Sequence, residues 1–111
     1  MSINDKRLLD CFEHIQINRQ LKSLNFSHNQ ITTKGFSALL KIIGKHPTLE
    51  ILYLNNNYLD SDSIALIRKR VGKLGKLRYI GLRNNQHISN VEQFKDVIHF
   101  LKKKKIRLDL K

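Results

Sequence analysis

This chain of 111 residues is poor in cysteine and has no long apolar run. Cys11 is the single cysteine, so the chain cannot form a disulfide within itself. No segment approaches the roughly 18 consecutive apolar residues that a membrane-spanning helix needs. Residues 1–7 lack the apolar core of a signal peptide. From these absences we expect an intracellular, cytoplasmic protein.

Clusters of residues that carry catalysis or bind metals are also missing. The five histidines show no metal-ligand spacing, and one cysteine cannot complete a zinc site. The sequence pairs no nucleophile with a base, and it places no two carboxylates where a pocket is expected. Residues 72–76 resemble a phosphate-binding loop only superficially, because their position predicts the end of a helix. We therefore predict that the protein is not an enzyme and that it uses no cofactor and no metal.

Acidic residues are few, since 9 Asp and Glu stand against 21 Lys and Arg, for a net charge of +12. The excess is uneven: residues 1–55 carry seven basic and four acidic side chains, whereas residues 56–111 carry fourteen and five. A surface this basic attracts nucleic acid, an anionic membrane or an acidic protein.

The feature that organises the chain is a repeat of 28 residues. Leu49, Leu52, Leu54, Asn57 and Leu59 have the spacing LxxLxLxxNxL. The same spacing recurs 28 residues upstream and 28 residues downstream, at Leu21, Leu24, Phe26, Asn29 and Ile31 and at Leu77, Ile80, Leu82 and Asn85. Self-similarity at a fixed period of this length is typical of solenoid proteins.

This pattern resembles the leucine-rich repeat, and its length and helical second half are similar to the ribonuclease-inhibitor-like subtype. The resemblance implies a short α/β solenoid, with a curved parallel sheet of about four strands on the concave side and helices on the convex side. We expect one domain, 1–111, that consists of a leading helix within 1–20, repeats near 21–48, 49–76 and 77–104, and a final strand at 106–110. Secreted members usually carry cysteine-rich caps, and their absence favours a reducing compartment.

The elements can be placed within each repeat. We predict a first helix over 5–16, strands at 22–26, 50–54 and 78–82, and helices that are capped by Thr32 or Thr33 and by Ser61. Left-handed glycine caps are expected at Gly44 and Gly72.

Two features of the last repeat depart from the period. Its helix core lies 30 residues after that of the previous repeat, which indicates two extra residues in the loop 84–93 and makes Ile88 the buried residue in place of His87. The register of the last strand has two alternatives, with either Leu108 or Leu110 in the position equivalent to Ile80.

Three asparagines, Asn29, Asn57 and Asn85, fall where the chain leaves each strand. Their amides can pair with the backbone groups that the turn exposes, so we predict a structural ladder along the solenoid. A shared functional site is the alternative, but the strict period favours the structural role.

Side chains alternate along a strand, so the residues between the leucines face away from the core. On adjacent strands these positions predict a protein-binding patch made of Ile51, Tyr53, Asn55, Tyr79 and Arg83. Gly81 is expected to leave a notch beside the Tyr53 ring. Exposed aromatic residues bordered by Arg and Asn are typical of interaction hot spots. The alternative is that the tyrosines merely cover the sheet.

A second candidate surface, here called the basic stripe, follows the helix C-termini. It consists of Arg68, Lys69, Lys73, Lys76, Lys102, Lys103, Lys104 and Lys105, and Lys41, Lys45 and His46 occupy the corresponding position one repeat earlier. Cations at helix C-termini also stabilise the helix, which is the alternative to a binding role. The stripe shows no interleaved aromatic residues, which counts against single-stranded nucleic acid.

The resemblance implies protein–protein interaction as the usual role. We therefore predict a module that binds another protein through its concave face. The alternative is an electrostatic binder of nucleic acid or anionic membrane that uses the basic stripe, and a further one is a subunit whose open ends are covered in a larger assembly.

Overall fold

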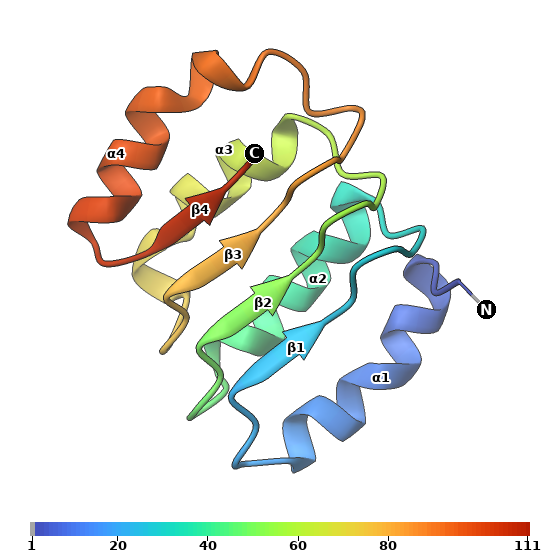
Figure 1. The fold of residues 1–111 in the computed structure, drawn as a ribbon. Coiled ribbons are helices and arrows are strands. Elements are labelled where there is room, and N and C mark those ends of the chain that lie inside the picture. The colour runs from blue at the N-terminus through green and yellow to red at the C-terminus, as the bar shows by residue number, and fades with distance from the viewer. Residues whose placement is uncertain (1) are drawn as a thin grey trace.

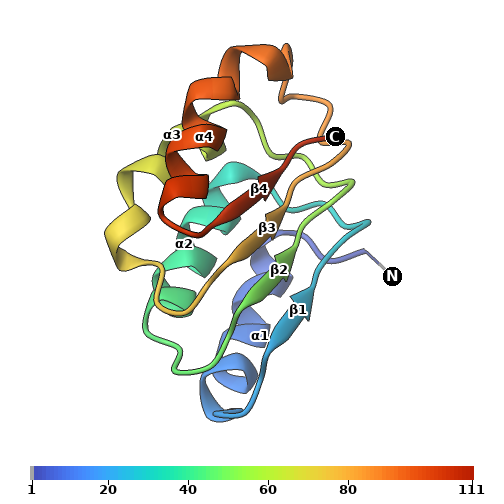
Figure 2. The ribbon, with the colours of Figure 1, turned by 60° about the vertical axis from the view of Figure 1, so that its left-hand side comes forward.

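The computed structural model describes residues 2–111 and shows helices and strands in regular alternation (Figure 1). The elements are, in order, α1 (Asp5–Ile17), β1 (Ser23–Asn25), α2 (Thr33–Gly44), β2 (Ile51–Tyr53), α3 (Asp62–Lys69), the 3-10 turn η1 (Val71–Lys73), β3 (Tyr79–Gly81), the 3-10 turn η2 (Val91–Phe94), α4 (Lys95–Lys103) and β4 (Arg107–Asp109). The strands form one parallel sheet in the order β1-β2-β3-β4, and all four helices lie on one side of it (Figure 2). The predicted α/β solenoid is confirmed.

The sheet keeps the 28-residue period from end to end. Ser23 pairs with Ile51, Ile51 pairs with Tyr79, and Tyr79 pairs with Arg107. In the last strand Leu108 is the partner of Ile80, so the 28-residue register is the correct one of the two alternatives.

The third repeat absorbs its two extra residues without disturbing the sheet. Ile88 is buried and His87 is exposed, as predicted for an insertion in the loop 84–93. Residues 104–106 connect α4 to β4, whereas residues 45–50 connect α2 to β2. The shorter connection after α4 therefore compensates for the longer loop before it.

The core lies between the sheet and the helices. Leu52 and Ile80 point from the strands toward Phe36, Leu40 and Ile64 on the helices, and all five side chains are fully buried. A single strand and helix cannot cover its own apolar side chains, so each coil of the solenoid is stabilised by the next one. None of the helices within residues 2–111 is both long and apolar enough to cross a membrane.

The predicted left-handed glycine caps are wrong. α2 ends at Gly44, but Lys45 after it keeps a right-handed conformation, and Gly72 lies within η1. Gly75 is the glycine with positive φ, at 61°. Gly44 has a different role, because a Cβ atom there would overlap the backbone carbonyl oxygen of Lys73. This glycine lets η1 approach the end of α2.

Thr32 and Ser61 occupy the N-cap positions of α2 and α3, as predicted, but neither hydroxyl makes a capping bond. The hydroxyls of Thr32 and Thr33 bind neighbouring coils instead. Thr32 donates from its hydroxyl to the Asp5 carboxylate, and Thr33 donates to Oδ1 of Asp60 at 2.8 Å. The start of α3 is bound by Asp60, whose Oδ1 accepts the N–H of Asp62 at 3.0 Å, and Ser61 makes no capping bond.

Candidate functional site

The face of the sheet that is turned away from the helices, here called the concave face, carries two tyrosines side by side. Leu52 and Ile80 point into the core, so the residues next to them, Ile51, Tyr53 and Tyr79, project from the opposite face. The ring centroids of Tyr53 and Tyr79 lie 5.4 Å apart, and the ring planes are tilted by 55°. Both rings are half-buried. The two strands therefore present one aromatic platform flanked by an aliphatic side chain.

The notch that was predicted at Gly81 is filled. Gly81 is buried, and a Cβ atom there would lie 3.2 Å from the Tyr79 ring, 3.4 Å from the Tyr53 ring and 3.1 Å from Oδ1 of Asn55. The prediction of an open notch is wrong, because both rings lean over the glycine. The absent side chain makes room for the aromatic pair itself.

Asp109 fixes one edge of this platform. Its Oδ2 accepts the hydroxyl of Tyr79 at 2.8 Å and the guanidinium of Arg83, through Nε at 3.0 Å and Nη2 at 2.9 Å. Burial by itself would raise the pKa of Asp109, but the hydrogen bonds from Arg83 and Tyr79 outweigh burial and hold that pKa below its ordinary value. Burial, and then the bond to Asp109, raises the pKa of Tyr79.

Arg107 and Asp109 were expected only to continue the rows of outward-facing residues and were not included in the predicted patch. Both project on the concave side of β4, and the guanidinium carbon of Arg107 lies 5.8 Å from the centroid of the Tyr79 ring. Alternation along the last strand already pointed to both residues. Their contacts with β3 follow only from the 28-residue register, which the sequence left open.

Asn55, one of the residues predicted for the patch, forms hydrogen bonds to neighbouring coils through its backbone N–H and its side-chain oxygen. Its N–H donates to the hydroxyl of Ser27 at 3.1 Å, and its Oδ1 accepts the N–H of Arg83 at 2.8 Å. It lies at the end of β2, beside the aromatic pair.

The three asparagines of the predicted ladder lie at equivalent turns. Each side-chain oxygen accepts a backbone N–H from the preceding coil: Asn29 from Ile3 at 2.7 Å, Asn57 from Ile31 at 3.0 Å and Asn85 from Leu59 at 3.0 Å. Each amide nitrogen donates to carbonyl oxygens near a strand end. The amide groups of these three side chains are therefore hydrogen-bonded within the fold.

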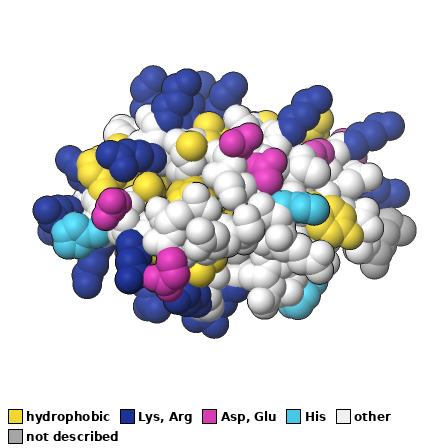
Figure 3. Space-filling view, turned by 90° about the horizontal axis from the view of Figure 1, so that it is seen from above, with side chains coloured by type: hydrophobic (Ala, Val, Ile, Leu, Met, Phe, Trp, Pro, Cys, Tyr) yellow, Lys and Arg dark blue, Asp and Glu magenta, His cyan; other side chains and the backbone are white. Residues whose placement is uncertain are grey.

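The members of the basic stripe are exposed. Within residues 2–111 none of them has a carboxylate at salt-bridge distance. Figure 3 shows Lys and Arg side chains projecting around much of the outline of one face, with fewer Asp and Glu side chains among them. The stripe is therefore a surface of uncompensated positive charge.

One aromatic ring does lie against the stripe, although cations already contact it. The guanidinium carbon of Arg68 lies 4.8 Å from the centroid of the Phe100 ring, and Nζ of Lys104 lies 5.8 Å from it. The sequence hid this contact because Arg68 and Phe100 belong to different helices. The ring supports the cations by cation–π attraction.

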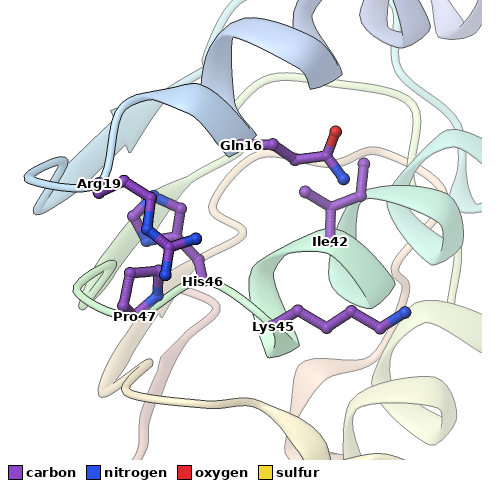
Figure 4. Close-up of a pocket in the computed structure, with 6 residues that line it drawn as sticks. All are labelled: Gln16, Arg19, Ile42, Lys45, His46 and Pro47. Carbon is purple, nitrogen blue, oxygen red and sulfur yellow. The ribbon is translucent and has the colours of Figure 1, made fainter.

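His46, which the spacing places beside Lys41 and Lys45, is buried. Nε2 lies 2.8 Å from the carbonyl oxygen of Asn18, and Nδ1 accepts the N–H groups of Thr48 at 3.2 Å and Leu49 at 3.1 Å. The ring closes a hollow of about 140 Å³ lined by Gln16, Arg19, Ile42, Lys45, His46 and Pro47 (Figure 4). His46 thus joins the turn after α1 to the turn after α2 and is not part of the exposed surface.

A metal site needs several converging ligands. Across residues 2–111 no group of three or more His, Cys, Asp or Glu side chains is placed to hold an ion. The thiol of Cys11 is free, half-buried and directed at the carbonyl oxygen of Arg7, 3.7 Å away. The chemistry on offer at this site is contact through aromatic, aliphatic and cationic groups.

Two segments of the chain match family models. Residues 18–40, which contain β1 and the first part of α2, match a model described as Leucine Rich repeat. Residues 48–69, which contain β2 and α3, match one described as Leucine Rich Repeat. A comparison with curated proteins finds no match.

Proposed function

Since the chain is a leucine-rich repeat protein, we propose that it is a non-enzymatic module that binds another protein through its concave face. Leucine-rich repeats are typically interaction modules, and the repeated coils create an extended surface for this purpose. The binding unit in this proposal is the single domain of residues 1–111, acting in the cytoplasm.

The observation that carries the proposal is the pairing of Tyr53 with Tyr79. Two half-buried rings 5.4 Å apart, next to Ile51, offer apolar area whose conformation is largely fixed before binding. The hydroxyl of Tyr79 is held by Asp109, which reduces the entropy that a partner must remove. Tyrosine and arginine are enriched among the residues that dominate binding energy, and Arg83 borders this pair.

An affinity purification with three forms of the full chain tests the proposal. The first is the unchanged protein, the second carries Tyr53→Ala and Tyr79→Ala, and the third carries Tyr58→Ala. Tyr58 is a matched control, because it is 50% exposed and lies beyond the end of β2. We expect the specific partners to be lost from the double variant and retained by Tyr58→Ala.

Thermal unfolding of each form shows whether a loss of binding reflects a loss of folding. A crosslinking amino acid at Ile51 provides a second readout in the otherwise unchanged chain, with the same group at the exposed Ala65 of α3 as its control. Partners that bind a folded double variant as tightly as the unchanged protein, or that crosslink equally from both positions, would refute the concave face as the site.

A further inference from the structure

The basic stripe and the concave face meet along one edge of the solenoid. In each coil the helix ends and the next strand begins on the same side, as Figure 1 shows for α4 and β4. Lys76 precedes Arg78 by two residues, and Lys105 precedes Arg107 by two. Two residues span at most about 7 Å. The stripe therefore continues into the sheet without a gap.

Arg107 lies at the junction of these two surfaces. Its backbone N–H donates to the carbonyl oxygen of Arg78, the residue before β3, at 2.9 Å, which fixes the two arginines on adjacent coils. Its guanidinium carbon lies 5.8 Å from the centroid of the Tyr79 ring. A single residue thus lies over one ring of the aromatic pair and follows the lysine run by two residues.

The charges along this junction are almost all positive. Glu50 is already bound to Arg78 at 2.9 Å and to Lys22 at 3.6 Å. Asp109 is bound to Arg83. Both carboxylates that border the concave face are therefore occupied, while Arg107 and the stripe have no carboxylate at salt-bridge distance within the described part of the chain.

We infer that the concave face and the basic stripe form one continuous site for an extended protein segment that carries an apolar or aromatic anchor next to a run of Asp or Glu residues. This inference rests on the proposed function and adds the chemistry of the partner. The anchor packs on Tyr53 and Tyr79, and the acidic run passes Arg107 and lies along Lys102–Lys105. Charge-assisted contacts of this kind add specificity and raise the association rate.

A protein segment fits these features better than nucleic acid or lipid does. Phe100, the aromatic ring within the stripe, is already contacted by Arg68 and Lys104, which leaves it poorly available for base stacking. A membrane surface would reach the protruding lysines but not two half-buried rings on the face of the sheet. The aromatic platform would then have no part in binding.

Three synthetic peptides test the inference. The first carries Leu-Phe-Leu followed by six Glu, the second replaces the six Glu with Gln, and the third replaces the anchor with Gly-Ser-Gly. Each is also made in the reverse order, because the direction of the partner chain is open. We expect the first peptide to bind at least about tenfold more tightly than either control at 50 mM salt. At high salt it should lose most of its advantage over the glutamine peptide, because salt screens the charges, and should keep its advantage over the Gly-Ser-Gly peptide, which reflects apolar contact.

A matched pair of protein variants locates the acidic run. One variant changes Lys102–Lys105 to Gln, and the other changes Lys6, Arg7, Lys34 and Lys95 to Gln, which removes the same charge from the N-terminal halves of the helices. We expect the first variant to lower the affinity for the glutamate peptide by roughly tenfold and the second to leave it within about twofold.

The outcomes separate this inference from the proposed function. If the stripe variant and its control bind the glutamate peptide equally, or if the glutamate and glutamine peptides bind equally, the continuous site is refuted while the concave face can still stand. If Tyr53→Ala with Tyr79→Ala leaves peptide binding unchanged, the anchor site fails, and the proposed function fails with it. Tighter binding to a single-stranded oligonucleotide or to phosphatidylserine vesicles than to the peptide would also overturn the inference.

Discussion

The side chain of Asn57 joins two coils that are separate in sequence. Its Oδ1 accepts the backbone N–H of Ile31 at 3.0 Å, and its Nδ2 donates to the carbonyl oxygens of Phe26 at 2.9 Å and Asn55 at 3.3 Å. The residue is almost fully buried. Water therefore cannot replace these bonds, and the amide oxygen supplies the partner that the buried N–H of Ile31 needs.

Asn57→Ala should lower the free energy of unfolding by roughly 1–3 kcal/mol, because the buried N–H of Ile31 loses its partner. The carbonyl oxygens of Phe26 and Asn55 each lose one bond but keep those from the Asn29 side chain and the His28 N–H. Urea denaturation of the full chain measures this change. The control is Asn25→Ala on the exposed side of β1, where the side chain accepts one bond from Ser27 and a loss of at most about 1 kcal/mol is expected. Equal losses in the two variants would contradict the structural role of Asn57.

Gly44 and Gly72 occupy equivalent places in successive repeats but should respond differently to substitution. A Cβ atom on Gly44 would overlap the backbone oxygen of Lys73, whereas nothing lies within 4 Å of the corresponding position on Gly72. Gly44→Ala should cost roughly 1–3 kcal/mol, because a backbone segment has to move. Gly72→Ala should be neutral or should stabilise by up to about 1 kcal/mol through the unfolded chain.

The melting temperatures of the two alanine variants provide the comparison. A lower melting temperature for Gly44→Ala together with an unchanged or higher one for Gly72→Ala is the expected result. If both variants lose stability alike, the close approach of η1 to α2 is not what requires glycine at residue 44.

Much of the fold was accessible from the sequence because one period controls both strand spacing and burial. Leu52 and Ile80 lie one repeat apart, and a shift of the strand register by a single residue would move both side chains from the core to the solvent-exposed face. The same alternation places Tyr53 and Tyr79 on the opposite face of the sheet. The leucine-rich repeat assignment followed from this pattern, whereas the ribonuclease-inhibitor-like subtype stays a prediction.

The details that the sequence did not reveal depend on contacts between coils. Thr33 looked like a helix cap, but its hydroxyl binds Asp60, 27 residues away, and this contact competes with the local one. Asp109 could not be assigned to the Tyr79 hydroxyl until the register of β4 was known. From the sequence, Gly81 was expected to leave a gap. Whether that space is filled depends on the rotamers of the neighbouring side chains, which the sequence does not reveal.

His46→Ala should destabilise the fold by roughly 2–4 kcal/mol, because the change leaves the N–H groups of Thr48 and Leu49 without a partner and removes the bond between the ring and the Asn18 carbonyl. His99→Ala on α4 is the control, since His99 is exposed and its loss should change stability by less than about 0.5 kcal/mol. Chemical denaturation at neutral pH measures both. A His46 variant as stable as the control would show that the ring does not hold the two turns together.

Asp109→Asn should give a pH-dependent loss of stability. The pKa of Asp109 in the folded chain lies below the ordinary value of 3.8, so the charged carboxylate stabilises the fold at every pH above that value. The contribution is lost as the pH falls through the lowered pKa, where the folded protein takes up the proton.

At pH 7 the variant should be less stable than the unchanged protein by roughly 1–3 kcal/mol, because Arg83 and Tyr79 lose a buried charged partner. The gap should begin to narrow as the pH falls below 3.8 and should close as it passes through the lowered pKa, where the unchanged protein loses the same charge. Denaturation midpoints from pH 7 to pH 2.5 measure the gap, and Asp96→Asn, an exposed position on α4 without a salt bridge among residues 2–111, is the control. A gap that stays constant over this range would mean that the amide alters packing alone, and that the charge of Asp109 does not hold Tyr79 and Arg83 in place.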